Sequence, residues 1–231
     1  MGPRQEHFRM MALYNQWANG RLYAAAGQIA PESLAEDRGA FFGSLLGTLN
    51  HLLVTDRLWM SRLDEESPPG TRLDEVLHHD FDDLRAARLV QDRKLVDYAH
   101  GLSEKRLAES LDYATSSGAP HSQPLHHVLA HLFNHQTHHR GQAHHLVGMA
   151  LGRDKAPVLD LLAFQRSTVP VPGAVSGPIS PPRLLPDDAG ASAVETPPIG
   201  HVVIDAYAEA ADPAGEVRST KRVPAPDSLG G

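Results

Sequence analysis

The segment "HLFNHQTHHRGQ", residues 131–142, holds four histidines in twelve positions. On a helix, residues four apart lie one above the other, close enough for two imidazole nitrogens to reach one metal ion. Three pairs have this spacing: His127/His131, His131/His135 and His135/His139. The spacing therefore predicts a metal-binding pair on one helix, but it does not choose among the three.

Helical periodicity selects the pair that faces the protein interior. At about 100° per residue, the apolar positions of this helix form one face: Leu125, Leu129, Leu132, Phe133, Ala143, Leu146, Val147 and Ala150. His139 falls about 40° and His135 about 80° from Leu125 on this wheel. We predict that both point into the bundle, either as metal ligands or as core histidines bonded to backbone or water.

The remaining histidines of this helix are expected to be solvated. Four fall on its far side: His127, His131, His138 and His145. His144 falls on the opposite flank from the pair, as a surface residue. Of these, His131 is the best candidate for a group that supports a site without binding the metal.

A third metal ligand must come from another helix. Catalytic zinc sites typically use three protein ligands and leave one position open. In the helix expected at 41–63, Asp56 lies on the apolar line, whereas His51 lies at its edge. Small residues leave room beside His51: Ser44, Thr48 and Thr55. Both residues stay candidates on periodicity, and Asp56 could instead orient a ligand histidine.

Two polar residues near the histidine pair are candidate pocket residues. Arg140 borders the apolar face, where it would bind a substrate carboxylate or pair with an acid of a neighbouring helix. Gln142 lies beside His135 on the wheel and could hydrogen-bond within the pocket.

Composition limits the chemistry and the partners. The chain has no cysteine, which excludes disulfides, thiolate metal ligands and a cysteine nucleophile. Its formal net charge is −7, from 21 basic and 28 acidic residues, and no basic patch favours nucleic acid over a small-molecule substrate. The N-terminus lacks the pattern of a signal peptide, and no stretch approaches the ~20 apolar residues of a membrane span. We expect a cytoplasmic protein without membrane contact.

Four amphipathic segments predict an all-α fold, a four-helix bundle. The expected helices span about residues 5–28, 41–63, 73–100 and 122–151. Ser122 is the expected N-cap of the last helix, and Gly152 is its expected end. A small hairpin is expected around "SSGAP" (116–120), and a short helix in "PVLDLLAFQR" (157–166).

The C-terminal part of the chain has a different composition. Eleven of the 18 prolines follow Arg166. We therefore predict a helical metal-binding domain at 1–166 and a largely disordered tail at 167–231, in which "HVVIDAY" (201–207) could pair as a strand.

The segments "TLNHLLVTDRLWMSRL" and "HLFNHQTHHRGQ", with "YNQWANGRL" in the first helix, resemble the DinB family over about residues 7–165. The resemblance implies an up-down-down-up four-helix bundle, commonly a homodimer, that binds a divalent metal through three histidines. It implies that His51 is the ligand from the second helix and that His135 and His139 are those from the fourth. The choice of His51 over Asp56 rests on this resemblance.

The resemblance extends to a wider group that includes mycothiol-dependent maleylpyruvate isomerase and bacillithiol S-transferases. Three neutral imidazoles leave a metal its full charge, which would lower the pKa of bound water to about 7 or hold a thiol as thiolate. We therefore expect a metal-dependent thiol S-transferase that uses a low-molecular-weight thiol, since the chain itself lacks cysteine.

Other functions stay open. A metal-dependent hydrolase needs a general base, but Gln136 follows His135, and Asp56 is the nearby acid placed inside. A non-catalytic, damage-inducible stress-response dimer that binds metal is a second alternative, and a plain bundle with satisfied histidines is a third. Imidazole suits zinc, nickel, copper and iron; the expected cofactor is a divalent zinc, nickel, manganese or iron ion.

Overall fold

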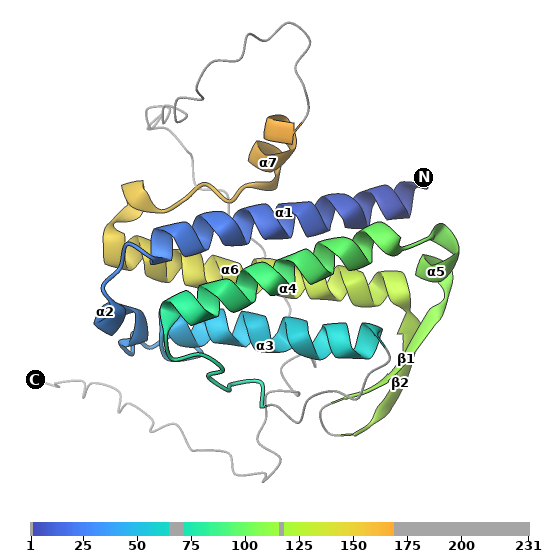
Figure 1. Cartoon of the computed structure of the whole chain (residues 1–231), viewed down its shortest axis with the longest axis horizontal. Helices are drawn as coiled ribbons and strands as arrows, with labels where there is room; N and C mark the ends of the chain where they lie inside the picture. The colour runs from blue at the N-terminus through green and yellow to red at the C-terminus, as the bar shows by residue number, and fades with distance from the viewer. Residues whose placement is uncertain (1, 65–71, 116–117, 169–231) are drawn as a thin grey trace, which may run out of the picture. The chain divides into compact units, whose positions relative to one another are not determined.

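Four long helices make up most of the fold, as the computed structural model shows for residues 2–64, 72–115 and 118–168 (Figure 1). They are α1 (Pro3–Ala26), α3 (Leu45–Leu63), α4 (Phe81–Gly101) and α6 (Leu125–Leu151). The shorter elements are α2 (Pro31–Ala35), α5 (Glu104–Ala108), a 3-10 turn η1 (Arg153–Lys155), α7 (Leu161–Thr168) and the strands β1 (Ser110–Ala114) and β2 (Pro120–Pro124). The predicted all-α class is confirmed in its coarse form.

The long helices enclose the apolar core. α1 packs against α4 and α6, and α3 packs against the same two helices. One core cluster, which includes Leu49, Leu52 and Leu146, lies toward the start of α3, and another, which includes Trp59 and Leu129, lies toward its end. None of the described helices is both long and apolar enough to cross a membrane.

α3 begins at Leu45, four residues later than expected, because the chain turns sharply just before it. Gly43 has φ of 72°, a conformation that favours glycine, and Ser44 is the N-cap. The Ser44 hydroxyl accepts a hydrogen bond from the Gly47 amide at 3.0 Å. His51 therefore lies in the second turn of α3.

α4 also starts later than expected, at Phe81 rather than near Leu73. Asp80 caps it by accepting hydrogen bonds from the amides of residues 82 and 83. The preceding segment is fixed to α3 instead: Asn50 donates to the carbonyl of His78 at 3.0 Å and accepts from its amide at 2.9 Å. This attachment brings residues 72–80 next to the first half of α3.

The expected N-cap at Ser122 is wrong. Ser122 belongs to β2, which pairs with β1 as the predicted hairpin, and α6 begins only at Leu125, after Pro124, without a side-chain cap. The expected end is confirmed, since Gly152 has φ of 95° and its amide donates to the carbonyl of Gly148.

The short helix α7 packs against the bundle. Phe164 of α7 packs against Tyr14 and Trp17 of α1. The described residues up to 113 and from 121 onward form one compact unit, and 114–120, at the hairpin tip, fall in a second. Residues 169–231, which hold most of the predicted tail and its "HVVIDAY" segment, lie outside the described residues.

Candidate metal centre

Three histidines from two helices meet inside the bundle. His51 comes from α3, and His135 and His139 come from successive turns of α6. Each offers a ring nitrogen, and these nitrogens all lie within 4.8 Å of one another. Nε2 of His51 and Nε2 of His135 are 3.3 Å apart. The described residues thus contain the convergence that a shared ion requires.

The His51 ring is oriented by the backbone of the 72–80 segment. Its Nδ1 lies 2.7 Å from the carbonyl oxygen of Leu73. A carbonyl only accepts, so Nδ1 carries the proton and Nε2 is left with a lone pair directed at His135. This is the usual arrangement for a metal-binding imidazole, in which the far nitrogen donates to a carbonyl or carboxylate.

Gln142 does the same for His139. Its side-chain oxygen lies 2.8 Å from Nδ1 of His139, and its amide nitrogen lies 3.2 Å from Nε2 of His138. Nδ1 of His139 donates to the amide oxygen, which leaves Nε2 unprotonated. Gln142 therefore contacts His139, rather than the His135 it borders on the wheel.

The three imidazoles are neutral at pH 7. Burial lowers the pKa of His51 to about 4 and that of His135 to about 2, where the neighbouring histidines lower it further. Burial also lowers the pKa of His139. Neutral imidazoles are the form that binds metal ions, so protons do not compete for these nitrogens near pH 7.

The donor set and its spacing fit a divalent cation. Two nitrogens at the usual 2.0–2.1 Å from a tetrahedral ion lie about 3.3 Å apart, and the separation of the two Nε2 atoms is 3.3 Å. Buried imidazole nitrogens need a partner, and a cation supplies one that three lone pairs can share. No carboxylate joins this group in the part of the chain that the structure describes.

Phe42, which sequence periodicity missed, covers the site. Its ring stacks on His51 at a centroid distance of 3.8 Å and meets His139 edge-on at 5.4 Å. The carbonyl of Phe42 approaches α3 so closely that a Cβ at position 47 would overlap it, which explains Gly47. Phe42 lies in the turn before α3, where no helical pattern reports which way a side chain points.

The family comparison agrees with this geometry. The model of the DinB family matches residues 4–174. The chain belongs to the DinB family. No curated protein matches the sequence. DinB membership and the buried histidine cluster together indicate metal binding.

In this DinB chain, Asp56 lies apart from the three histidines. Its carboxylate is 2.7 Å from the guanidinium of Arg88 and accepts a hydrogen bond from Gln136. The group that orients His51 is the Leu73 carbonyl rather than this carboxylate. Burial disfavours the charge of Arg88, but the carboxylates of Asp92 and Asp56 outweigh it, so the pKa of Arg88 is raised.

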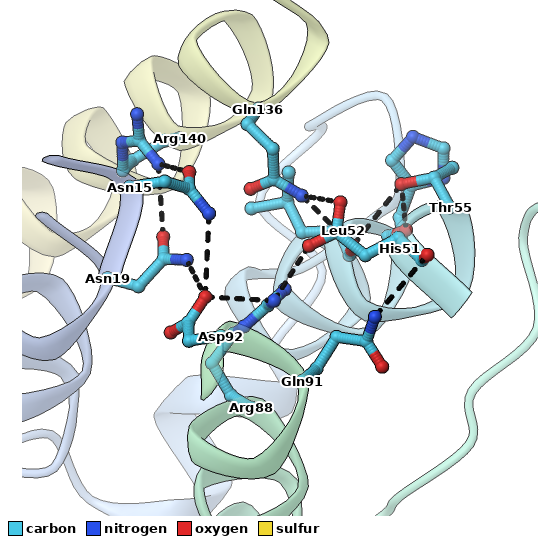
Figure 2. Close-up of polar contacts among 11 residues, drawn as sticks. Asn15, Asn19, His51, Leu52, Thr55, Arg88, Gln91, Asp92, Gln136 and Arg140 are labelled. Atoms are coloured by element: carbon cyan, nitrogen blue, oxygen red, sulfur yellow. Dashed lines mark hydrogen bonds and ion pairs between the residues drawn. The ribbon is translucent and has the colours of Figure 1, made fainter. Parts of the chain in front are cut away.

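Arg140 is buried and bonded to amides instead of an acid. Its guanidinium donates to Oδ1 of Asn15 at 2.5 Å and to Oδ1 of Asn19 at 3.1 Å (Figure 2). Asn19 in turn donates to Asp92 at 2.9 Å. The pairing with an acid that the sequence suggested is therefore indirect, through asparagine side chains of α1.

Four of the expected solvated histidines are exposed: His127, His131, His138 and His145. His144 is instead half-buried, and its Nε2 lies 2.9 Å from the carbonyl oxygen of Pro157. The His131 ring lies 5.4 Å from that of Trp59 and 6.0 Å from that of His135. His131 thus borders the site without belonging to the group whose nitrogens converge.

Proposed function

We propose that the protein is a metal-dependent thiol S-transferase in which His51, His135 and His139 bind a divalent ion. The observation that carries the proposal is that ring nitrogens of the three histidines lie within 4.8 Å of one another, with two Nε2 atoms 3.3 Å apart. The helix directions in Figure 1 support the up-down-down-up bundle of the family, in which α3 and α6 bring their histidines together.

The chain's own residues prepare the site in three ways. The Leu73 carbonyl and Gln142 hold the protons of His51 and His139 on the far nitrogens. Phe42 stacks on the His51 ring and covers that face of it. Burial keeps the imidazoles neutral.

A divalent cation held by neutral imidazoles is a Lewis acid that favours the thiolate form of a bound thiol. In the proposed reaction the thiol loses its proton to solvent. Its sulfur then forms a bond to an electrophilic carbon, and the leaving group departs with its bonding electron pair. The sulfur belongs to a small co-substrate, because the chain contains no cysteine.

The hydrolase alternative loses the base that the sequence offered for it. Asp56, the acid that sequence analysis offered for this role, is paired with Arg88 and accepts from Gln136. Its carboxylate is therefore engaged by α4 and α6, and it does not belong to the described group of converging histidine nitrogens.

A non-catalytic metal-binding protein is the second candidate. A cavity of about 420 Å³ is lined by residues that include Leu63, Asp97 and Arg106. It lies at the C-terminal end of α3, whereas His51 lies near the start of that helix. This cavity therefore does not adjoin the histidines. A cavity away from the proposed metal site agrees with the non-catalytic candidate, so one assay should test both candidates.

The test loads the full chain with zinc, nickel, manganese or iron and assays a panel of low-molecular-weight thiols against an electrophile. The proposal expects a rate above the protein-free control that the variant His135→Ala loses. Metal bound at one ion per chain without any rate increase would favour the non-catalytic candidate. Absence of bound metal would overturn both.

A further inference from the structure

A single buried amide connects the two ligand-bearing helices at the level of the ligands. Gln136 is 0% exposed. Its Nε2 donates to the carbonyl oxygen of Leu52 at 3.2 Å and to a carboxylate oxygen of Asp56. Gln136 follows His135 and Leu52 follows His51, so the link from α6 to α3 lies one residue beyond each proposed ligand.

The acceptor of this link is itself held in place from a third helix. Arg88 of α4 contacts Asp56 at 2.7 Å and Asp92 at 2.9 Å, and all three side chains are buried. Figure 2 shows the contact between Arg88 and Asp92. A buried carboxylate with a fixed cation and a fixed donor has little freedom to move. The position of Gln136 is therefore determined by α3 and α4 together.

We propose that Gln136 is a positioning residue that fixes the register of α6 against α3 and so sets the distance between His51 and His135. The inference rests on the proposed function, since it concerns the same histidines. A slip of one residue along a helix moves a side chain by about 1.5 Å and turns it by about 100°. Metal–ligand distances tolerate only about 0.2 Å.

Apolar packing alone would hold this register less firmly. Leucine side chains in a core interchange with modest cost, whereas a buried amide needs its acceptors at defined places. The Leu52 carbonyl and the Asp56 carboxylate lie one turn apart on α3. Both can accept from Nε2 of Gln136 only when α6 and α3 are aligned as they are here. The same alignment brings His51 and His135 face to face.

The same network contains a matched control. Asn19 of α1 is equally buried, but it donates to Asp92 of α4 and accepts from Arg140 of α6, so these hydrogen bonds do not join α6 to α3. If Gln136 were only structural, Gln136→Met and Asn19→Leu would both lower thermal stability, and both would leave metal binding unchanged. The proposal instead expects weaker metal binding in Gln136→Met alone.

The experiment titrates the metal-free full chain and each variant with cobalt(II) chloride. The visible absorption of bound cobalt reports affinity and coordination geometry, and thermal unfolding is followed in parallel. Gln136→Met is expected to weaken cobalt binding by about 10- to 100-fold and to change the spectrum. Asn19→Leu is expected to keep the affinity and spectrum of the unmodified chain while it lowers the melting temperature.

The outcomes distinguish this inference from the proposed function. No cobalt binding by the unmodified chain would overturn the proposed function. Binding by the unmodified chain that Gln136→Met leaves unchanged would overturn the positioning role. If Gln136→Met does not fold, Gln136→Asn decides the question, because it keeps an amide that is one methylene too short for the Leu52 carbonyl. Unchanged affinity there would also overturn the role.

Discussion

Nε2 of His51 lies 3.3 Å from Nε2 of His135, although the two residues are 84 positions apart in the chain. Two neutral rings at this distance share either a proton or a cation. The centroid of a third ring, that of His139, lies 4.4 Å from the ring centroid of His135 and 4.5 Å from that of His51. The three converging rings and the buried ion pairs of Arg88 lead to four predictions.

His135→Ala should weaken divalent metal binding by about 100-fold or more, because one of three ligands is lost. Isothermal titration with zinc measures the change. His131→Ala is the control, since His131 is four residues away on the same helix but exposed. Equal losses in the two variants would show that surface histidines, rather than the buried group, bind the ion.

Metal removal should lower the melting temperature. A ligand that binds only the folded state at 100 times its dissociation constant stabilises it by about 2.7 kcal/mol, equivalent to about 5–10 °C for a chain of this size. Differential scanning calorimetry with chelator and with added zinc measures the shift. His135→Ala should show little dependence on zinc, and a shift of the same size in that variant would argue against the site.

Phe42→Ala should destabilise the fold by about 1 kcal/mol and weaken metal binding, because it removes the ring stacked on His51. Chemical denaturation and zinc titration measure the two effects. Phe41→Ala is the neighbouring control, since Phe41 is 61% exposed. The prediction fails if the Phe41 variant loses as much zinc affinity as the Phe42 variant.

Arg88→Met should cost about 3–5 kcal/mol of stability, because it leaves the carboxylates of Asp56 and Asp92 buried without a cation. Arg85→Met is the control on the same helix, where an exposed arginine lies 3.9 Å from Asp82 and should contribute less than about 1 kcal/mol. Urea unfolding compares them, and similar values would mean that the Arg88 pairs are not what holds α3 to α4.

The candidate metal-site residues on the long helices could be predicted because their surroundings are periodic. His139 is buried and His135 half-buried, as the apolar face of α6 indicated, and the histidines on the far side are exposed. Periodicity also predicted that Asp56 is buried, and it is. It could not choose between His51 and Asp56, because burial does not reveal that Arg88, on another helix, holds the carboxylate.

Features outside the helices could not be predicted in the same way. Leu73 and Ser122 were assigned to helices, yet Leu73 precedes α4 and Ser122 lies in β2. The contact of the Leu73 carbonyl with His51 depends on the hydrogen bond that Asn50 makes to His78. The contact of Phe42 with His51 depends on the turn at Gly43. Both are tertiary contacts of irregular backbone, for which a sequence carries no repeating signal.

The partner that fixes the His51 ring is a main-chain oxygen, and this has a consequence for how the protein can vary. Exchange of the Leu73 side chain leaves that oxygen in place, so many residues are tolerable at position 73. Deletion of one residue between Leu73 and the anchored His78 would instead draw the oxygen away by about 3.3 Å. Selection at this edge of the site should therefore act on the length of the segment more than on its composition.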